Sequence, residues 1–113
     1  MLFNKNIIVD MNEMMEEHSV IVLLNKGVNS IEKLHIDINE ALLNKKYDDI
    51  EFCAHSISSI SGTFGCEDLF KICREIEYLC IDGEFDEVIN ISKELDSLIS
   101  KTIDEVKLYL SEF

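Results

Sequence analysis

His55 is the residue of this sequence whose type and setting best suit nucleophilic chemistry. It lies within the stretch Tyr47–Cys66, which reads YDDIEFCAHSISSISGTFGC. A neutral imidazole has an unperturbed pKa of about 6.5, so it can accept a phosphoryl group near neutral pH. This chemistry needs one ring nitrogen free and the other held or solvated. Exposure on the outer face of a helix would meet that requirement.

A helix over residues 48–61 would place His55 on such a face. At about 100° per residue, one apolar stripe of this helix must face a core. The stripe consists of Ile50, Cys53, Ala54, Ile57, Ile60 and Phe64. His55 falls roughly 160° from the centre of the stripe. We therefore expect the imidazole to point to water or to a partner.

The neighbours of His55 on this face are the residues three, four and seven positions away, because these touch along a helix. They are Glu51, Phe52, Ser58, Ser59 and Gly62. C-terminal to the histidine the face is nearly bare, so another protein could bring its own side chains close to the imidazole. Phe52 would add an exposed apolar contact beside it.

This arrangement resembles the histidine phosphotransfer (HPt) domain of multi-step phosphorelays, whose pattern is approximately His-x-Leu-Lys-Gly-Ser-Ser-x-x-[Leu/Phe]-Gly. The matching positions are His55, Ile57, Ser61, Phe64 and Gly65, followed by Leu69, Cys73, Ile76 and Glu77 in the next helix. The resemblance spans residues 10–110, and its motif lies in the middle third of the chain. It implies that His55 is a phosphoryl acceptor.

Two positions near His55 depart from the family pattern. Ser58 stands where the family has a lysine, and Ser59 stands where it has a glycine. The resemblance implies that both lie close to the phosphoryl group. A serine hydroxyl can hydrogen-bond a phosphoryl oxygen but brings no positive charge, and charge-assisted contacts are about twice as strong as neutral ones.

The mechanism implied by the resemblance requires a second protein. A receiver domain would dock on the face formed by Glu51, Phe52 and Gly62 with the two serines, and would present its phosphoaspartate and Mg²⁺ to His55. The phosphoryl group would pass to the imidazole and later to the aspartate of another receiver. The expected partners are response-regulator receiver domains and a hybrid histidine kinase. We expect no metal and no cofactor on the chain itself.

The sequence carries no signal for a kinase. It lacks a P-loop, a Gly-x-Gly-x-x-Gly motif and any cluster of acidic residues with Mg²⁺-site spacing near His55. We therefore expect no kinase or nucleotide-binding activity, and whether the chain is an enzyme in its own right stays open. The alternative of another class is a non-catalytic docking module that binds and sequesters a receiver or a kinase.

The four cysteines suggest a core role. Cys66, Cys73 and Cys80 recur every seven residues, which spaces them by about 10 Å along one stripe of a helix, too far apart for a shared disulfide or metal. Cys53 lies on the core stripe of the preceding helix. We expect free thiols that pack as small apolar groups in a reducing cytosol. A redox switch that pairs Cys53 with Cys66 or Cys73 is the alternative.

Composition indicates an all-helical protein. The chain has 113 residues, 47% of them hydrophobic, with no proline and only four glycines, and we expect one domain over residues 1–113. Its net charge of −13 disfavours nucleic acid and anionic membranes, which are bound mainly through Lys and Arg. There is no apolar run long enough for a membrane span, and the N-terminus is too acidic for a signal peptide. We therefore expect the protein to be located in the cytoplasm.

Hydrophobic periodicity predicts the elements that position His55. We expect a short helix over residues 6–17 and longer helices over 19–45, 48–61, 66–80 and 84–110, with Ser19 capping the second and Asp48 or Asp49 capping the third. The connecting turns are short, so consecutive helices should be antiparallel. The expected fold is an antiparallel up-down-up-down four-helix bundle with a short extra N-terminal helix.

Overall fold

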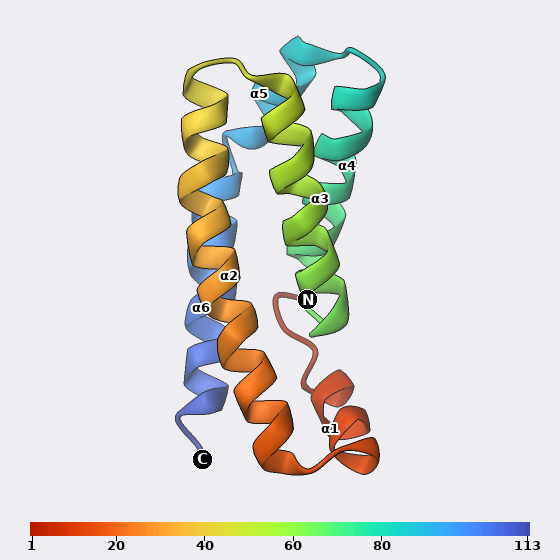
Figure 1. Cartoon of the computed structure of the whole chain (residues 1–113), viewed down its shortest axis with the longest axis vertical. Coiled ribbons are helices and arrows are strands. Elements are labelled where there is room, and N and C mark those ends of the chain that lie inside the picture. Colours follow the sequence, from red (N-terminus) through yellow and green to blue (C-terminus); the bar gives the residue numbers. More distant parts are fainter.

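The computed structural model describes residues 1–113 and contains helices but no strands (Figure 1). The six helices are α1 (Lys5–Met14), α2 (Glu17–Leu43), α3 (Tyr47–Thr63), α4 (Glu67–Ile81), α5 (Phe85–Ser92) and α6 (Leu95–Leu110). The all-helical class predicted from the sequence is therefore confirmed.

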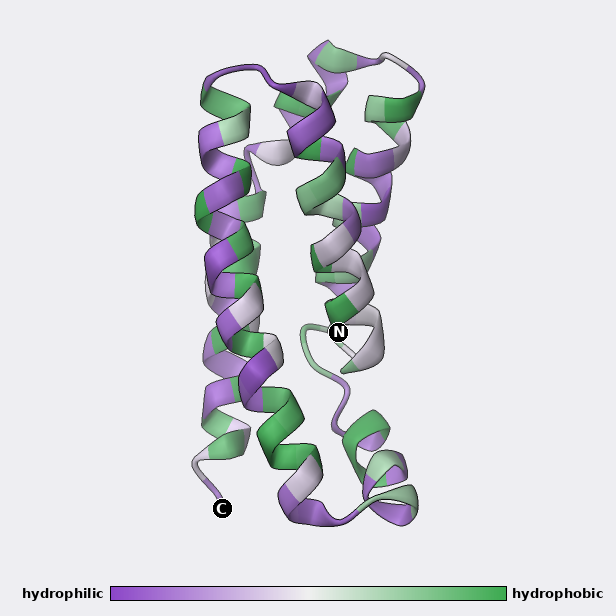
Figure 2. Ribbon diagram, viewed as in Figure 1, coloured by the Kyte–Doolittle hydropathy of each residue, from purple (hydrophilic) through white to green (hydrophobic).

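The helices form an elongated bundle of 43 × 21 × 20 Å. Figure 1 shows α2, α3 and α4 running in alternating directions, with α6 returning beside α2 and α1 lying at one end near the start of α2. Apolar ribbon segments lie along every helix and alternate with hydrophilic ones, as Figure 2 shows. The core is one continuous cluster to which α1 through α6 all contribute.

The predicted core stripe of α3 is buried except at Ile60, which is partly buried. Ile50, Ala54 and Ile57 have no exposed surface, and Cys53 and Phe64 are 5% and 8% exposed. These side chains face α2 and α4, which flank α3 (Figure 1). The burial of this stripe fixes the rotation of α3 about its axis, and with it the direction of His55.

Two helices begin earlier than their polar residues suggest. The second helix begins at Glu17 after the N-cap Glu16, so Ser19 lies inside the helix and the prediction that it caps the helix is wrong. The third helix begins at Tyr47 after Lys46, and Asp48 and Asp49 occupy its first turn. Carboxylates in the first turn stabilise a helix through its dipole without capping it.

The expected helix over residues 84–110 is two helices, α5 and α6. Around Lys93 and Glu94 the backbone makes hydrogen bonds of the i→i+3 type. The N–H groups of these two residues donate to the carbonyls of Asn90 and Ile91, each with an N···O distance of 3.3 Å. Such a turn redirects the axis between the two segments. Hydrophobic spacing does not detect the break because both segments keep one buried face, with Val88 and Leu95 each 0% exposed.

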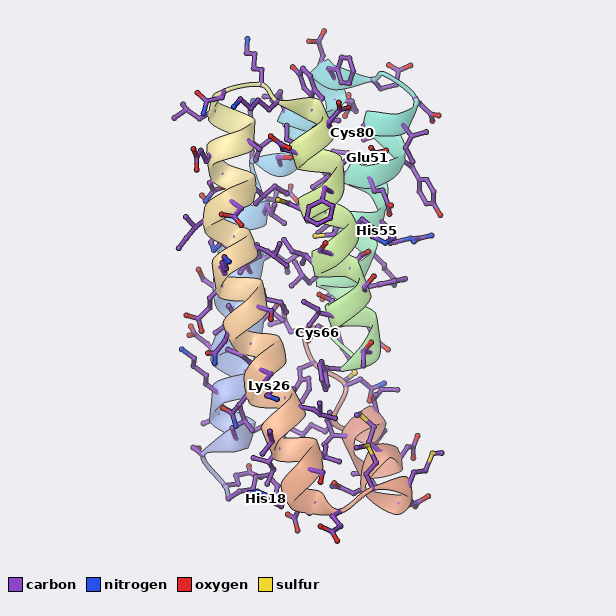
Figure 3. All side chains as sticks on the ribbon, in the orientation of Figure 1. His18, Lys26, Glu51, His55, Cys66 and Cys80 are labelled. Atoms are coloured by element: carbon purple, nitrogen blue, oxygen red, sulfur yellow. The ribbon has the colours of Figure 1, made fainter.

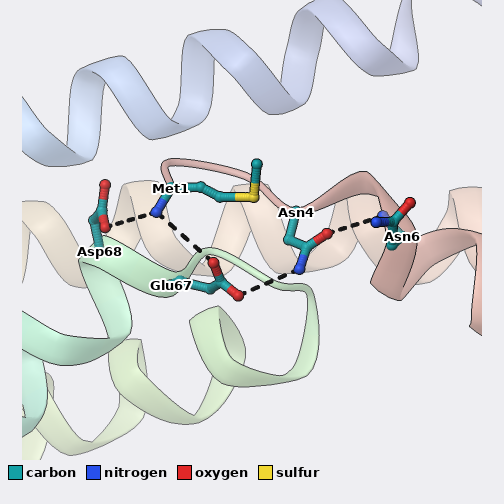
Figure 4. A network of polar contacts seen from close by, with 5 residues as sticks. All are labelled: Met1, Asn4, Asn6, Glu67 and Asp68. Carbon is teal, nitrogen blue, oxygen red and sulfur yellow. Dashed lines mark hydrogen bonds and ion pairs between the residues drawn. The ribbon is translucent and has the colours of Figure 1, made fainter.

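The N-terminal residues bind the turn between α3 and α4. The Asn4 N–H donates to the carbonyl of Gly65 at 2.8 Å, and the Asn4 side-chain amide donates to Glu67 at 3.3 Å. The Met1 ammonium lies 2.9 Å from Asp68, and the Asn4 side-chain oxygen accepts from the Asn6 N–H at the start of α1 (Figure 4). This segment therefore ties α1 to the end of the bundle nearest Gly65.

Gly65 is required by the geometry of this turn. Its φ of +77° lies in the left-handed region, and a Cβ there would stand 2.9 Å from the Asn4 carbonyl oxygen and 2.9 Å from Ile7. Gly83, in the turn after α4, has a similar φ of +74° but open space around it. The two glycines therefore differ in packing and share the same backbone conformation.

We predict that Gly65→Ala destabilises the fold more than Gly83→Ala. The left-handed conformation costs either alanine about 1 kcal/mol, and the collision with Asn4 and Ile7 brings the total at position 65 to about 2–4 kcal/mol. Urea denaturation of both variants measures the difference. Equal losses in the free energy of unfolding would show that the N-terminal segment does not pack against Gly65.

Candidate active site

His55 lies in the middle of α3 on the side next to α4, as Figure 3 shows. Its side chain is 55% exposed. The predicted exposure of the imidazole is therefore confirmed.

One nitrogen of the His55 ring is held by a carboxylate from α4. The His55 Nδ1 lies 2.6 Å from Oε2 of Glu77, whose side chain is only 12% exposed. An ionised carboxylate only accepts hydrogen bonds, so the neutral imidazole carries its proton on Nδ1. The lone pair of Nε2 is then free on the exposed side of the ring. This is the arrangement that a nucleophilic histidine needs.

Glu77 in turn contacts a cluster on α4. Its Oε1 lies 3.6 Å from Nη1 of Arg74 and makes no hydrogen bond. The Arg74 guanidinium lies 4.9 Å from the ring centroid of Tyr78, donates to the Tyr78 hydroxyl, and lies 5.9 Å from the ring centroid of Phe70. Sequence reasoning matched Glu77 to the motif without giving it a role, and it missed Arg74. The i, i+3 spacing of Arg74 and Glu77 was the available signal.

The predicted position of Ser58 on the outer face is wrong. Ser58 is 1% exposed, and its hydroxyl donates to the backbone carbonyl of His55 at 2.7 Å. Because both α2 and α4 cover α3, the buried arc of the helix is wider than its stripe of large apolar residues. Small serines fit against the neighbouring helix, and Ser61 is also buried, at 0% exposed.

The other residues predicted for the outer face remain accessible. Ser59 and Gly62 are exposed, Phe52 is 66% exposed, and Glu51 is half-buried. A Cβ on Gly62 would lie 3.1 Å from the ring of Phe70, so this glycine makes room for an aromatic side chain of α4. The structure thus places Phe52, Ser59 and Gly62 on one helix with His55, and it removes Ser58 from this surface.

The other two histidines lack this arrangement. The Nε2 of His35 lies 2.6 Å from Asp96, and the His35 side chain is 22% exposed. The hydrogen bond from His35, together with one from Asn39, lowers the pKa of the Asp96 carboxyl. His18 is exposed in the first turn of α2 and makes no side-chain hydrogen bond. Only His55 combines a held Nδ1 with an exposed ring.

The four cysteines are free and buried, as the sequence predicts. Burial raises the pKa of Cys73 to about 12 and that of Cys66 to about 11. Burial also raises the pKa of Cys80 to about 11, with a smaller contribution from the nearby Glu51 carboxylate. Because the thiolate is the reactive form, the raised pKa lowers the reactivity of these thiols near neutral pH.

The structure contains no group of three or more His, Cys, Asp and Glu side chains that could hold a metal ion. It also contains no helix long and apolar enough to cross a membrane.

The helical bundle with one exposed, carboxylate-held histidine fits a phosphotransfer domain, and sequence comparison identifies the family. The sequence model of the Hpt domain matches residues 23–107, which include His55 and Glu77. The chain therefore belongs to the Hpt domain family, whose members work in two-component phosphorelays.

A solved structure shares this fold. Histidine-containing phosphotransfer protein B from Pseudomonas aeruginosa PAO1 superposes with a TM-score of 0.89 at 20% sequence identity, covering 99% of this chain and 96% of that one. No curated protein matches the sequence significantly. The structural similarity supports the bundle over its whole length.

We predict that Glu77 fixes the tautomer of His55. In ¹⁵N NMR spectra of the native protein, His55 should show a protonated Nδ1 and an unprotonated Nε2, and Glu77→Leu should abolish this preference because the acceptor is gone. Removing one partner of a buried pair can cost about 3–5 kcal/mol, so the tautomer is read under conditions in which circular dichroism shows that the variant is folded. Glu75→Leu, at an exposed site on the same helix, is the control and should leave the His55 signals unchanged.

We also predict that Cys66 and Cys73 resist alkylation in the native protein. At about pH 8 the raised thiol pKa and burial leave almost no accessible thiolate, so iodoacetamide should modify these cysteines only after denaturation. Mass spectrometry of digested protein reports each site. If either cysteine of the folded protein reacts at the rate of a free thiol, the prediction is wrong and the redox switch is favoured.

Proposed function

We propose that this protein accepts a phosphoryl group on Nε2 of His55 from the phosphoaspartate of a receiver domain and passes it to the aspartate of another receiver. The single observation that carries the proposal is the 2.6 Å contact between His55 Nδ1 and Glu77, because it leaves Nε2 as the nucleophilic nitrogen. Membership of the Hpt domain family supports the same assignment.

The proposed step is an in-line displacement at phosphorus. The Nε2 lone pair forms the new N–P bond, the bond between phosphorus and the aspartyl oxygen breaks, and the aspartate leaves as a carboxylate. The ring then carries a positive charge with its proton still on Nδ1, and the Glu77 carboxylate stabilises that charge. In phosphoryl transfer, catalysis comes almost entirely from positioning and electrostatics. We propose that the receiver supplies the Mg²⁺.

The docking surface that we propose lies along the outer face of α3. It contains Phe52 one turn before His55, and Ser59 and Gly62 one and two turns after it, with Glu51 at its edge. Phe52, at 66% exposed, would provide an apolar anchor, while the small side chain of Ser59 would let the receiver approach the imidazole. At Gly62 the receiver would meet the ring of Phe70, which packs against this glycine. We propose receiver domains and a hybrid kinase as partners, meeting this chain in the cytoplasm.

One observation favours a second candidate, a docking module that binds receivers without accepting phosphate. From His55 to its end at Thr63, α3 carries no basic residue, and the serine in the lysine position is buried. A domain that only sequesters a receiver would need no such charge.

We predict that phosphorylated receiver domains label this protein on His55. With a panel of purified receivers, the label should be acid-labile and base-stable, as expected for phosphohistidine, and should fall to background in His55→Gln while receiver binding persists. His35→Gln should keep the label, because the label is expected on His55. His35 itself should not react at Nε2, since Asp96 already holds that nitrogen.

Receiver binding without labelling of the native protein would establish the docking module instead. Binding can be followed independently by titration calorimetry with the same receivers.

A further inference from the structure

The phosphoryl group on His55 would enter an acidic environment. The chain carries a net charge of −13, and the carboxylate of Glu77 contacts the imidazole directly. A phosphoryl group adds up to two more negative charges. With no basic residue on α3 beyond His55, any compensating charge from this chain has to come from a neighbouring helix.

The antiparallel packing of α3 against α4 places a positively charged side chain of α4 beside the turn of α3 that follows His55. His55 faces Glu77, and seven residues further along α3 Gly62 faces Phe70, which is seven residues back along α4. The antiparallel register is therefore constant between these two contacts. It places Ser58, three residues after His55, level with Arg74, three residues before Glu77.

The Ser58 side chain does not occupy the surface at its own position, so a side chain from α4 can lie there. Its hydroxyl turns inward to the carbonyl of His55, and the residue is 1% exposed. Arg74, in contrast, keeps 36% of its side chain exposed. On the accessible surface at this level, α4 therefore presents a basic side chain where α3 presents none.

The guanidinium of Arg74 is held in place by its neighbours, and most of its N–H donors make no hydrogen bond. The rings of Phe70 and Tyr78 flank it, and it donates one hydrogen bond, to the Tyr78 hydroxyl. A guanidinium has five N–H donors in a planar fork that matches phosphate oxygens. Its Nη1 lies 3.6 Å from Glu77 Oε1, beyond hydrogen-bond distance. His55 and Arg74 thus lie at the two oxygens of the same Glu77 carboxylate, and most of the guanidinium donors are unused.

We infer that Arg74 binds the phosphoryl group carried on Nε2 of His55, so that the positive charge of this site comes from α4. The inference rests on the proposed function and adds a residue to it. The guanidinium donates to the phosphoryl oxygens while Glu77 keeps the Nδ1 proton. Because Arg74 lies next to Glu77, the test has to distinguish a direct contact with the phosphoryl group from an effect that acts through Glu77.

Phosphoramidate tests this inference without any partner protein. The His55 Nε2 lone pair attacks its phosphorus, the P–N bond breaks, and ammonia leaves, so the reaction reports on this chain alone. We expect Arg74→Gln to slow phosphorylation of His55 about fivefold to tenfold, since one charge-assisted contact is lost. Arg74→Lys keeps the charge but loses the donor fork, so it should slow the reaction less than Arg74→Gln does. Lys26→Gln, which makes the same change in net charge on α2 away from His55 (Figure 3), should match the native protein.

Three results would overturn the inference. The first is a native rate in Arg74→Gln, and the second is an equal loss in Arg74→Lys, which would show that charge is not what matters. The third is a shift of the His55 tautomer in the ¹⁵N spectrum of folded Arg74→Gln, which would make Arg74 a positioning residue that acts through Glu77.

The same experiment separates this inference from the proposed function. Native His55 that reacts with phosphoramidate but with no receiver would contradict the relay and leave the Arg74 measurement intact. Failure of His55 to react with phosphoramidate at all would contradict its role as a nucleophile, and with it the inference about Arg74.

Discussion

The contact between His55 and Glu77 joins the two helices on which the site depends. It crosses from α3 to α4 at 2.6 Å, so both the rotation of each helix and their relative register must be right for it to form. Burial of Ile50, Ala54 and Ile57 sets the rotation of α3, and burial of Leu69, Cys73 and Ile76 sets that of α4. A hydrophobic core thus controls the state of a solvent-exposed imidazole.

The turn between α3 and α4 maintains this register. Gly65 adopts a left-handed conformation there, and the N-terminal segment hydrogen-bonds across the turn to Gly65 and Glu67. Phe3 in the same segment is buried against Tyr109 of α6, with ring centroids 5.5 Å apart. The four N-terminal residues therefore connect the hairpin that holds the site to the last helix of the bundle.

Much of the fold follows from the sequence because hydrophobic periodicity reports burial directly. The core stripe of α3 and the exposure of His55 could be predicted in this way. Ser58 could not, because a serine has no apolar signal and its burial depends on how closely α4 packs. The break at Lys93 and Glu94 was hidden for a related reason, since the helices on either side keep the same buried face. The i, i+3 spacing of Arg74 and Glu77 is visible in the sequence, but the position of Arg74 beside Ser58 depends on the register of two helices, which no single-helix pattern contains.

The open setting of the imidazole has a consequence for timing. More than half of the His55 side chain faces solvent. If His55 carries a phosphoryl group as proposed, that group is open to water as well as to a partner. Its lifetime would then be set by the intrinsic lability of the N–P bond and by the local charges, and not by enclosure within the protein.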